Sequence, residues 1–410
     1  MKNYKLIRIK QKFQDNRLDD VIGSTAGELK KIGGSIKPGS RIAIAAGSRG
    51  IRNLAQVVAE AVRFIRSKNA TPFIIPAMGS HGDATAEGQR GVLESYGITE
   101  DAMGAPVLSS MEVVELPFSD SPVKIYMDRY AYDSDGVILI NRIKPHTDFH
   151  GRYESGLVKM AVIGLGKEKQ ASAIHDYGVY GLSDLIPEVA KRVLSTGKIL
   201  GGIGLVENAF DETMMVRFLK GGEFMDIEPV LLDVARKNMP SLPVNDIDVL
   251  IIDKMGKDIS GVGIDPNIIG RIKITGQKEP EKPVIKAIMV SDLTDASHGN
   301  ATGVGLADVI TRKLYDKIDL SATYVNAVTS SFIERAKIPV IAANDREAFS
   351  IALRSCGHLT GGNERIMRIK STLHLDEIYI SESILAELDV RGQGGEYVNL
   401  FNEHGVLNAF

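Results

Sequence analysis

The chain has 410 residues, which is long enough for two or three domains. Its 49 basic and 52 acidic residues leave a formal net charge of -3, whereas a nucleic-acid-binding protein needs a basic excess to neutralise phosphates. No apolar run approaches the roughly 20 residues that cross a bilayer, and the first residues lack the apolar core of a signal peptide. We therefore expect a cytoplasmic protein that binds neither nucleic acid nor membrane.

The sequence holds a single cysteine, Cys356. One thiol excludes an internal disulfide, an iron–sulfur cluster held by thiolates and a zinc site with several Cys ligands. It also excludes a racemase that passes a proton between two thiols. Redox or metal chemistry would have to use His, Lys, carboxylates or a bound cofactor.

The first half alternates apolar runs with helical periodicity, as α/β folds do. The apolar residues of segment 53–68 recur at i, i+3 and i+4, which predicts one buried helix face. The expected elements in chain order are a strand at 41–46, a helix at 53–68, a strand at 71–76, a helix at 83–96, and strands at 136–141 and 199–206.

Two prolines in a short polar stretch, Pro240 and Pro243, mark a boundary. After it the alternation restarts, with apolar segments at 248–252, 287–290, 322–327 and 340–343 interpreted as strands. We therefore predict an α/β fold of two domains with mostly parallel sheets and the active site in the cleft between them. The domains would be 1–240, with the tail 390–410 packing back on it, and 244–389, which would close the cleft.

No nucleotide fingerprint is complete. Glycine pairs such as Gly164/Gly166 and Gly202/Gly204 never extend to G-x-G-x-x-G, and no P-loop sequence occurs. A standard dinucleotide site is therefore not expected.

Polar residues follow the first predicted strand, in the run Gly47-Ser48-Arg49-Gly50-Ile51-Arg52 before a helix. Ligands of open α/β sheets bind beyond the carboxyl ends of strands, and helix N-termini favour anions. Arg49 or Arg52 could bind a carboxylate or phosphate through two hydrogen bonds. The alternative is a solvated loop arginine.

Histidines follow the next two strands. His81 lies between small residues in Gly79-Ser80-His81-Gly82, where it could act as a general acid or base, although a lone loop histidine is often without function. The third strand leads to His146, His150, Lys159 and His175. His146 and His150 follow Pro145 and lack the Glu of the metalloprotease pattern. This density, in a chain with eight His, predicts a site.

The second domain offers two polar, glycine-rich loops, Lys254–Arg271 and Asp295–Gly303. The first contains Lys257, Asn267 and Arg271 and follows an apolar strand, so it could face a cleft. Helix capping and turn geometry explain the same residues nearly as well.

These residues resemble the nickel-dependent lactate racemase family, whose members racemise or epimerise 2-hydroxy acids with a nickel-pincer nucleotide. The resemblance covers both domains and is strongest between Ile42 and His175. It is carried by the Gly47-Ser48-Arg49 turn, the Gly79-Ser80-His81-Gly82 loop and the run Pro145-His146…Ser155-Gly156-x-x-Lys159…His175.

The resemblance implies a role for each matched residue. Lys159 would hold the cofactor covalently through a thioamide, and His175 would be the protein ligand of nickel. His81 and His146 would be the acid/base pair, with His150 as the alternative to His146. The remaining implied residues are Ser48 at the cofactor, Arg49 or Arg52 at the substrate carboxylate, Lys257 as a further catalytic group, and Asn267 and Arg271 at the substrate.

The chemistry agrees with this resemblance. A carboxylate acidifies the neighbouring C–H poorly, so inversion is easier when a hydride leaves, forms a planar 2-keto acid and returns to either face. That route needs a hydride acceptor, two bases and a cation. The leading hypothesis is an isomerase for a 2-hydroxy acid that depends on cofactor-making enzymes. The absence of Trp favours a hydroxylated acid such as an aldonate over lactate.

Two other hypotheses remain open on the sequence. One is a protein that binds a sugar acid or nucleotide without turnover. The other is a zinc-dependent hydrolase or lyase with His146, His150 and His175 as ligands.

Overall fold

The computed structural model describes residues 4–48, 50–357, 363–388 and 395–410. The chain forms two compact units, one of Gln14–Met239 and one of the residues up to Phe13 together with Pro240–Phe410. We call them the N-terminal and the C-terminal unit. Each contains helices and a large, mostly parallel sheet, which confirms the predicted fold class of two α/β domains.

The N-terminal unit has a five-stranded sheet in the order β3-β2-β6-β7-β8. The first four strands are parallel, and β8 pairs antiparallel with β7. A separate two-stranded sheet pairs β4 with β5. The strands are β2 (Arg41–Ala46), β3 (Thr71–Pro76), β4 (Val113–Glu115), β5 (Tyr126–Asp128), β6 (Gly136–Arg142), β7 (Ile199–Glu207) and β8 (Thr213–Lys220).

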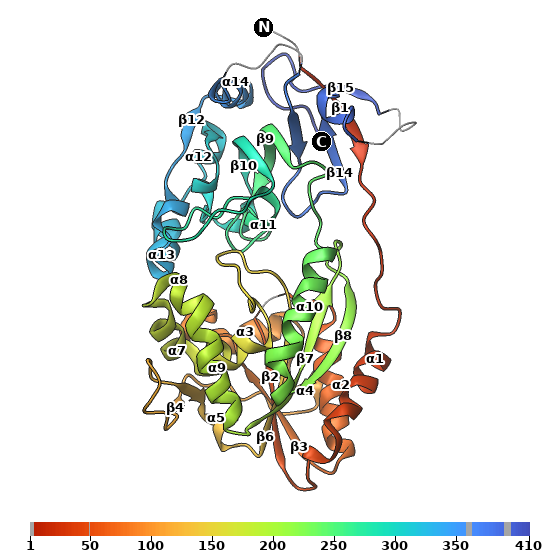
Figure 1. The fold of residues 1–410 in the computed structure, drawn as a ribbon, viewed down its shortest axis with the longest axis vertical. Coiled ribbons are helices and arrows are strands. Elements are labelled where there is room, and N and C mark those ends of the chain that lie inside the picture. Colours follow the sequence, from red (N-terminus) through yellow and green to blue (C-terminus); the bar gives the residue numbers. More distant parts are fainter. Residues whose placement is uncertain (1–3, 49, 358–362, 389–394) are drawn as a thin grey trace. The chain divides into compact units, whose positions relative to one another are not determined.

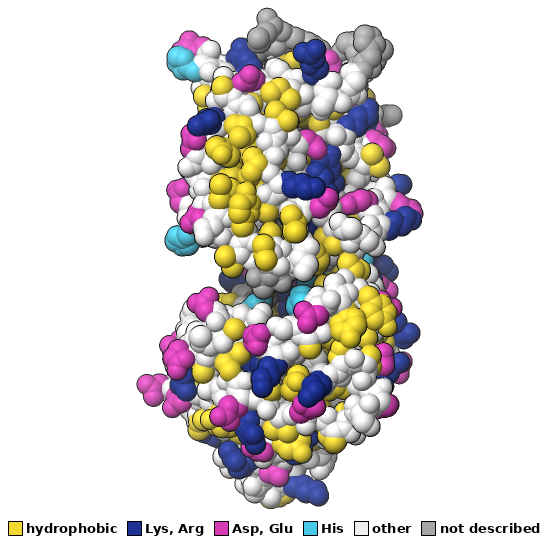
Figure 2. All heavy atoms as spheres, turned by 90° about the vertical axis from the view of Figure 1, so that its left-hand side faces the viewer, with side chains coloured by type: hydrophobic (Ala, Val, Ile, Leu, Met, Phe, Trp, Pro, Cys, Tyr) yellow, Lys and Arg dark blue, Asp and Glu magenta, His cyan; other side chains and the backbone are white. Residues whose placement is uncertain are grey.

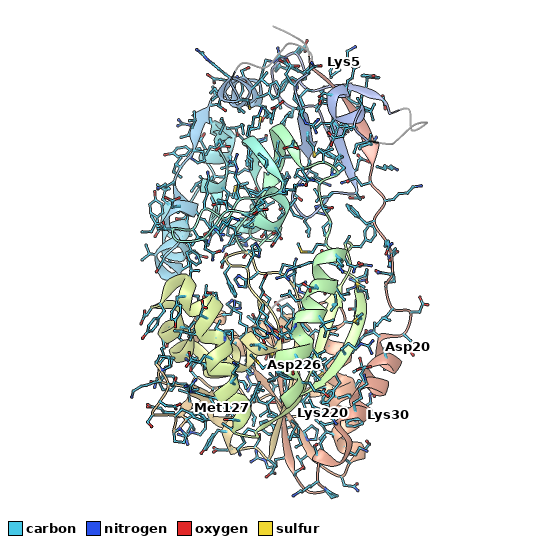
Figure 3. The ribbon with its side chains drawn as sticks, viewed as in Figure 1. Lys5, Asp20, Lys30, Met127, Lys220 and Asp226 are labelled. Carbon is cyan, nitrogen blue, oxygen red and sulfur yellow. The ribbon has the colours of Figure 1, made fainter. Side chains whose placement is uncertain are left out.

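Helices cover both faces of this sheet, with α1 and α2 on one side and α7 and α9 on the other (Figure 1). Asp20, at the start of α1, caps it by accepting the N–H of Gly23 at 2.8 Å (Figure 3). The helices are α1 (Val21–Leu29), α2 (Leu54–Ser67), α3 (Ala86–Ser95), α4 (Glu100–Met103), α5 (Arg129–Asp133), α6 (Leu157–Lys159), α7 (Leu165–His175), α8 (Gly178–Tyr180), α9 (Ile186–Ser195) and α10 (Phe224–Asn238).

The continuous apolar sequence of β2 is explained by this coverage. Ile42 and Ile44 belong to the core beneath α2, while Ala43 points to the opposite face, and all three are at most 1% exposed. A parallel strand buried on both faces reads as an unbroken apolar run rather than an alternating one. The strands predicted at 41–46, 71–76, 136–141 and 199–206 are confirmed.

The predicted helix at 83–96 begins later than expected. Gly82 and Asp83 have positive φ angles of 63° and 54°, so the chain turns there instead of entering a helix. α3 starts at Ala86, and the Thr85 hydroxyl caps it by accepting the N–H of Gly88 at 3.0 Å. The extra turn keeps His81 in a loop after β3.

The C-terminal unit has an eight-stranded sheet in the order β12-β11-β10-β9-β13-β14-β1-β15. The strands from β12 to β13 are parallel to one another, and the last three are antiparallel to their neighbours. The elements are β1 (Lys5–Lys10), β9 (Asp246–Met255), α11 (Pro266–Ile269), β10 (Val284–Leu293), β11 (Val309–Thr311), α12 (Arg312–Tyr315), α13 (Leu320–Ser330), β12 (Val340–Ala342), α14 (Asp345–Ser355), β13 (Ile366–Ile369), β14 (Glu377–Ile380), α15 (Glu382–Leu385) and β15 (Tyr397–Asn399).

Both ends of the chain belong to the C-terminal unit, contrary to the expected packing of the tail on residues 1–240. The tail strand β15 pairs with β1, and β1 pairs in turn with β14. These two ladders pair the backbone of Lys5–Lys10 with two other strands, which periodicity along the chain could not reveal. The unit boundary lies between Met239 and Pro240.

The segment 322–327, interpreted as a strand, is helical and lies within α13. The Asp319 carboxylate caps this helix by accepting the N–H of Ala322 at 3.0 Å, and the cap overrides the β propensity of Tyr324 and Val325. The third parallel strand along the chain is instead the short β11.

The C-terminal unit exposes apolar side chains over α13 and β12. Tyr324, Val325 and Val328 of α13 are 44%, 61% and 70% exposed, and Val340 of the edge strand β12 is 55% exposed. Figure 2 shows hydrophobic side chains gathered on the side where these elements lie in Figure 1. Among the described residues, no helix has the length and apolarity to span a bilayer.

The pairing of β1 with β14 and β15 predicts that the N-terminus stabilises the C-terminal unit. Leu6 is 1% exposed, so Leu6→Ala should lower the free energy of unfolding by about 2–5 kcal/mol. Exposed Lys5, its neighbour on β1 (Figure 3), provides the control, because Lys5→Ala should change it by less than about 0.5 kcal/mol. Urea titration measures both; equal effects would contradict the strand assignment.

Candidate functional site

The site is built at the carboxyl ends of β3, β2 and β6, which are neighbouring parallel strands. Because parallel strands end at the same edge of a sheet, the loops that follow them lie together. These loops carry Ser48, His81 and His146, and the helical run after His146 carries Lys159 and His175. The structure therefore places all five predicted residues in the N-terminal unit.

Ser48 and His81 are brought together from two loops. The Ser48 hydroxyl is hydrogen-bonded to Nδ1 of His81. The Tyr96 hydroxyl donates to the Ser48 carbonyl at 2.6 Å and fixes the β2 loop. Nδ1 is thus engaged by the protein, and the His81 side chain is exposed. Arg49, predicted in the same turn, lies outside the described residues.

A buried amide supports the His81 loop from below. Gln89 of α3 is fully buried, and its Nε2 donates to the carbonyls of Gly79 at 2.8 Å and His81 at 3.2 Å. Its Oε1 accepts a hydrogen bond from Lys167 Nζ at 3.0 Å. The two polar ends of one side chain therefore tie the loop to α7.

Lys167 is itself fully buried and lies in a strained backbone conformation with φ 56°. Its Nζ donates to the carbonyl of Pro76, the last residue of β3, at 2.5 Å and lies 3.1 Å from Asp128 Oδ2. Burial lowers the pKa of Lys167 and raises the pKa of Asp128, and their mutual attraction opposes both shifts. Lys167 therefore has a structural role.

Glu154 organises the loop that carries His146. This buried carboxylate accepts the backbone N–H of His146 at 2.6 Å and binds Arg236 of α10 at 2.6 Å. His150 Nδ1 lies 3.4 Å from its Oε1. Burial would raise the pKa of Glu154, but hydrogen bonds from His150 and from the His146 backbone, with Arg236, lower it below its usual value. His150 is thus paired with Glu154, whereas His146 turns its ring to Lys159.

The side chains of His146 and Lys159 are in direct contact through their nitrogen atoms. The Asp148 backbone N–H donates to His146 Nδ1 at 3.0 Å, and a backbone amide can only donate. Nε2 of the same ring lies 2.5 Å from Lys159 Nζ.

Lys159 and His175 lie on one helical run, in which a π-helical segment, Met160–Gly164, joins α6 to α7. π-Helical turns are frequent at functional sites. Burial, and then the charge of Lys159, lowers the pKa of His175, although Asp148 and Asp176 oppose this. The lowered pKa favours the neutral form of His175, in which imidazole binds a metal.

The His81 loop packs on this same run. The Gly79 N–H donates to the Gly164 carbonyl at 3.5 Å, and a Cβ atom at Gly79 would overlap Ile163 of the π-helical segment. Gly79 also has a positive φ of 62°, which a side chain would disfavour. Glycine at this position lets the two halves of the site approach closely.

The start of the run is capped by a buried acid. Glu228 of α10 is 1% exposed, and its Oε2 accepts the N–H groups of Leu157 at 2.6 Å and Val158 at 2.9 Å. A Cβ at Gly156 would overlap this carboxylate. Asn141 of β6 donates to the Gly156 carbonyl at 3.0 Å. Burial raises the pKa of Glu228 to about 7, although the two backbone hydrogen bonds oppose the rise.

Of the two arginines predicted to bind an anion, the structure describes Arg52. Arg52 Nε lies 3.2 Å from Glu212 Oε2, and the Arg52 side chain is 60% exposed. Its backbone N–H donates to Glu207 at 2.7 Å, and Glu207 also binds Arg142 at the end of β6. Arg142, which sequence reasoning did not single out, is therefore a further cation beside the β2 loop.

In the C-terminal unit, the predicted site residues form hydrogen bonds with other groups of the same unit. Arg271 donates to Asp308 at 2.6 Å and to the carbonyl of Ile285 at 2.7 Å. Lys257 Nζ donates to Gly261 O and to Asn326 Oδ1, each at 2.8 Å. Asn267 Nδ2 donates to Asp265, which caps α11, at 2.9 Å. The turn and capping explanation therefore accounts for these contacts.

A site made of protein ligands alone is not found. Within the described ranges, no three His, Cys, Asp or Glu side chains are placed to hold a metal ion. The described residues thus give no support to the zinc hypothesis, in which His146, His150 and His175 would share one ion; there His150 pairs with Glu154 and His146 with Lys159.

Comparisons with known proteins give the fold and no more. No protein-family model and no curated protein matches the sequence. The chain is similar to the structure of the lactate racemase apoprotein from Thermoanaerobacterium thermosaccharolyticum, with a TM-score of 0.56 and 10% identity over 90% of this chain and 99% of that one. A protein from Thermotoga maritima matches with a TM-score of 0.48 and 12% identity, over 68% and 72%. The chain thus has a lactate-racemase-like fold.

The cap at Glu228 predicts a pH-dependent stability. Its folded-state pKa of about 7 lies above the usual 4.5, so its contribution to stability is complete below pH 4.5 and is lost as the pH rises through 7. The loss amounts to about 3 kcal/mol. Relative to wild type, Glu228→Gln should therefore become more stable between pH 5 and pH 8.

Urea titrations at several pH values measure this difference, from which the other titrating groups cancel. Asp226 is two residues away and 81% exposed (Figure 3), so Asp226→Asn should show no such trend. A constant difference between wild type and Glu228→Gln across this range would contradict the buried position of Glu228.

Proposed function

We propose that the chain is a racemase or epimerase of 2-hydroxy acids that uses a nickel-pincer nucleotide attached to Lys159. One observation carries the proposal: Lys159 Nζ lies 2.5 Å from His146 Nε2 on a helical run that ends at His175. The lactate-racemase-like fold supports it.

The residues present fit such a group. A covalent tether needs an amine, and Lys159 supplies one beside the His146 ring. A nickel ion bound mainly by its own cofactor needs few protein ligands, and the neutral imidazole of His175 is a good one. Lys167 does not compete for the tether, because it is buried and bonded to Gln89 and Asp128.

The bound cofactor would accept and return the hydride of the substrate. His81 and His146 would exchange the hydroxyl proton, each for one stereoisomer, because the two hydroxyls lie on different sides of the keto-acid plane. The residues come from loops after different strands, β3 and β6, so they can approach one substrate from two directions. Ser48 would hold the His81 ring by its Nδ1.

A cation would bind the carboxylate of the substrate. Arg52 and Arg49 follow β2, as proposed from the sequence, and Arg142 ends the neighbouring β6. Arg271, whose guanidinium is bonded to Asp308 and backbone carbonyls, stays a proposal from the sequence. Lys257 and Asn267 remain proposals, as do cytoplasmic location, cofactor-making partner enzymes and a hydroxylated substrate such as an aldonate.

The tether predicts a mass change. Protein expressed with cofactor-making enzymes should carry a covalent increment on Lys159, and Lys159→Ala should abolish both the increment and activity because no amine remains to form the bond. Lys169→Ala is the matched control, since this exposed lysine lies on α7 and should keep the increment. Intact-protein and peptide mass spectrometry measure both.

Wild-type protein without an increment, or an increment that persists in Lys159→Ala, would overturn the proposal.

Nickel analysis of the same samples tests the role of His175. His175→Ala should lose nickel while keeping its far-ultraviolet circular dichroism, and unchanged nickel content would remove His175 from the site.

A further inference from the structure

The helix α10, which lies outside every sequence motif, binds residues next to both His146 and Lys159, on which the proposed chemistry depends. It begins at Phe224 beside the loop between β6 and α6, and its charged side chains reach that loop at two places. Arg236 binds the carboxylate that holds the His146 backbone, and Glu228 binds the start of the run that carries Lys159.

The first of these contacts fixes His146. Arg236 donates to Glu154 Oε1 at 2.6 Å and to the Gly151 carbonyl at 3.0 Å. The other oxygen of Glu154 accepts the His146 N–H at 2.6 Å. Glu154 is fully buried, so its charge would be costly without Arg236. The position of His146 thus depends on a guanidinium from α10.

The second contact fixes Lys159. The first N–H groups of a helix have no partner within it, and Glu228 accepts those of Leu157 and Val158, the two residues before Lys159. Among the described residues, its Oε1 has no hydrogen-bond partner. Oε2 accepts in either protonation state, so the cap persists across the pH range in which the acid titrates.

A proline in α10 creates a third contact. Pro229 has no N–H, so the carbonyl of Met225, four residues earlier, lacks its helical donor. That carbonyl accepts the Tyr153 hydroxyl at 2.7 Å. A proline inside a helix ordinarily weakens it. Here the carbonyl that Pro229 leaves without a donor joins α10 to the same loop, next to Glu154.

These contacts come from one rigid element. Glu228 and Arg236 are eight residues apart, about 12 Å along the helix axis. Because α10 binds the loop through Glu228 and Arg236, the helix fixes the distance between the two parts of the loop that these side chains bind. Asp226, at 81% exposure, lies 4.0 Å from Arg152 of the same loop, and Lys237 is exposed, but neither binds the carboxylate that holds His146 or the start of α6.

We infer that Glu228 and Arg236 are positioning residues, through which α10 holds the His146 ring against the Lys159 amine. The inference rests on the proposed function for the use of that contact in cofactor attachment and acid/base chemistry. The positioning itself is a property of the protein without cofactor, and can be measured there.

The test compares backbone hydrogen exchange in the full-length protein without cofactor. Glu228→Ala leaves the amides of Leu157 and Val158 without an acceptor, so their exchange should accelerate about tenfold or more. Glu228→Gln keeps an acceptor of the same length and should restore exchange to within about threefold of wild type. Peptides from β2 should be unchanged in both variants.

Asp226→Ala is the control for charge removal from the same helix turn and should leave the Leu157 and Val158 amides unchanged. Arg236→Ala extends the test to the other end of α10 and remains informative if Glu228→Ala does not fold. It should accelerate exchange at the His146 amide, whereas Lys237→Ala should not.

Exchange within twofold of wild type at these amides in both Glu228→Ala and Arg236→Ala would overturn the inference, as would equal acceleration in the controls. Failure of Glu228→Gln to restore protection would also overturn it. The proposed function fails separately, when wild-type Lys159 carries no increment. In protein loaded with cofactor, the inference further predicts that Glu228→Ala lowers kcat more than tenfold while Glu228→Gln retains it.

Discussion

Parallel pairing of β3, β2 and β6 is the constraint on which the rest of the site depends. It sends three loops from one edge of the sheet and so assembles side chains that are up to 127 positions apart in sequence, Ser48 and His175. The register also explains the apolar content of these strands, because helices on both faces leave no solvated side. Polar residues can appear only where the strands end.

Buried charges then fix the geometry at this edge. Lys167 with Asp128, Arg236 with Glu154, and Glu228 with two backbone N–H groups each remove a charge or a carboxyl from water. Such groups often stabilise a protein no more than apolar side chains of similar size would. Their common feature here is that each bonds to a loop or helix start next to His81, His146 or Lys159. We therefore attribute their presence to the positioning of these residues rather than to the stability of the fold.

The sequence predicted the strands and the candidate site residues. It did not predict the side chains that hold those residues in place. Apolar runs predicted β2, β3, β6 and β7 because buried parallel strands leave a local signal. His146 and Lys159 were singled out because several His and a Lys follow one strand closely in the sequence. Glu154, Glu228 and Arg236 carry no local signal, since their partners lie far away along the chain or are backbone N–H groups. The same reason hides the pairing of β1 with β14, which joins residues about 370 positions apart.

The central claim is that inversion proceeds by hydride transfer, and isotope retention tests it most directly. Protein shown by mass to be loaded at Lys159 would be given one stereoisomer of each of several 2-hydroxy acids, deuterated at C2, in ordinary water. A hydride that leaves and returns does not mix with solvent, so the account predicts an inverted product that keeps its deuterium. Inverted product carrying solvent hydrogen at C2, or loaded protein that inverts none of the acids, would contradict it.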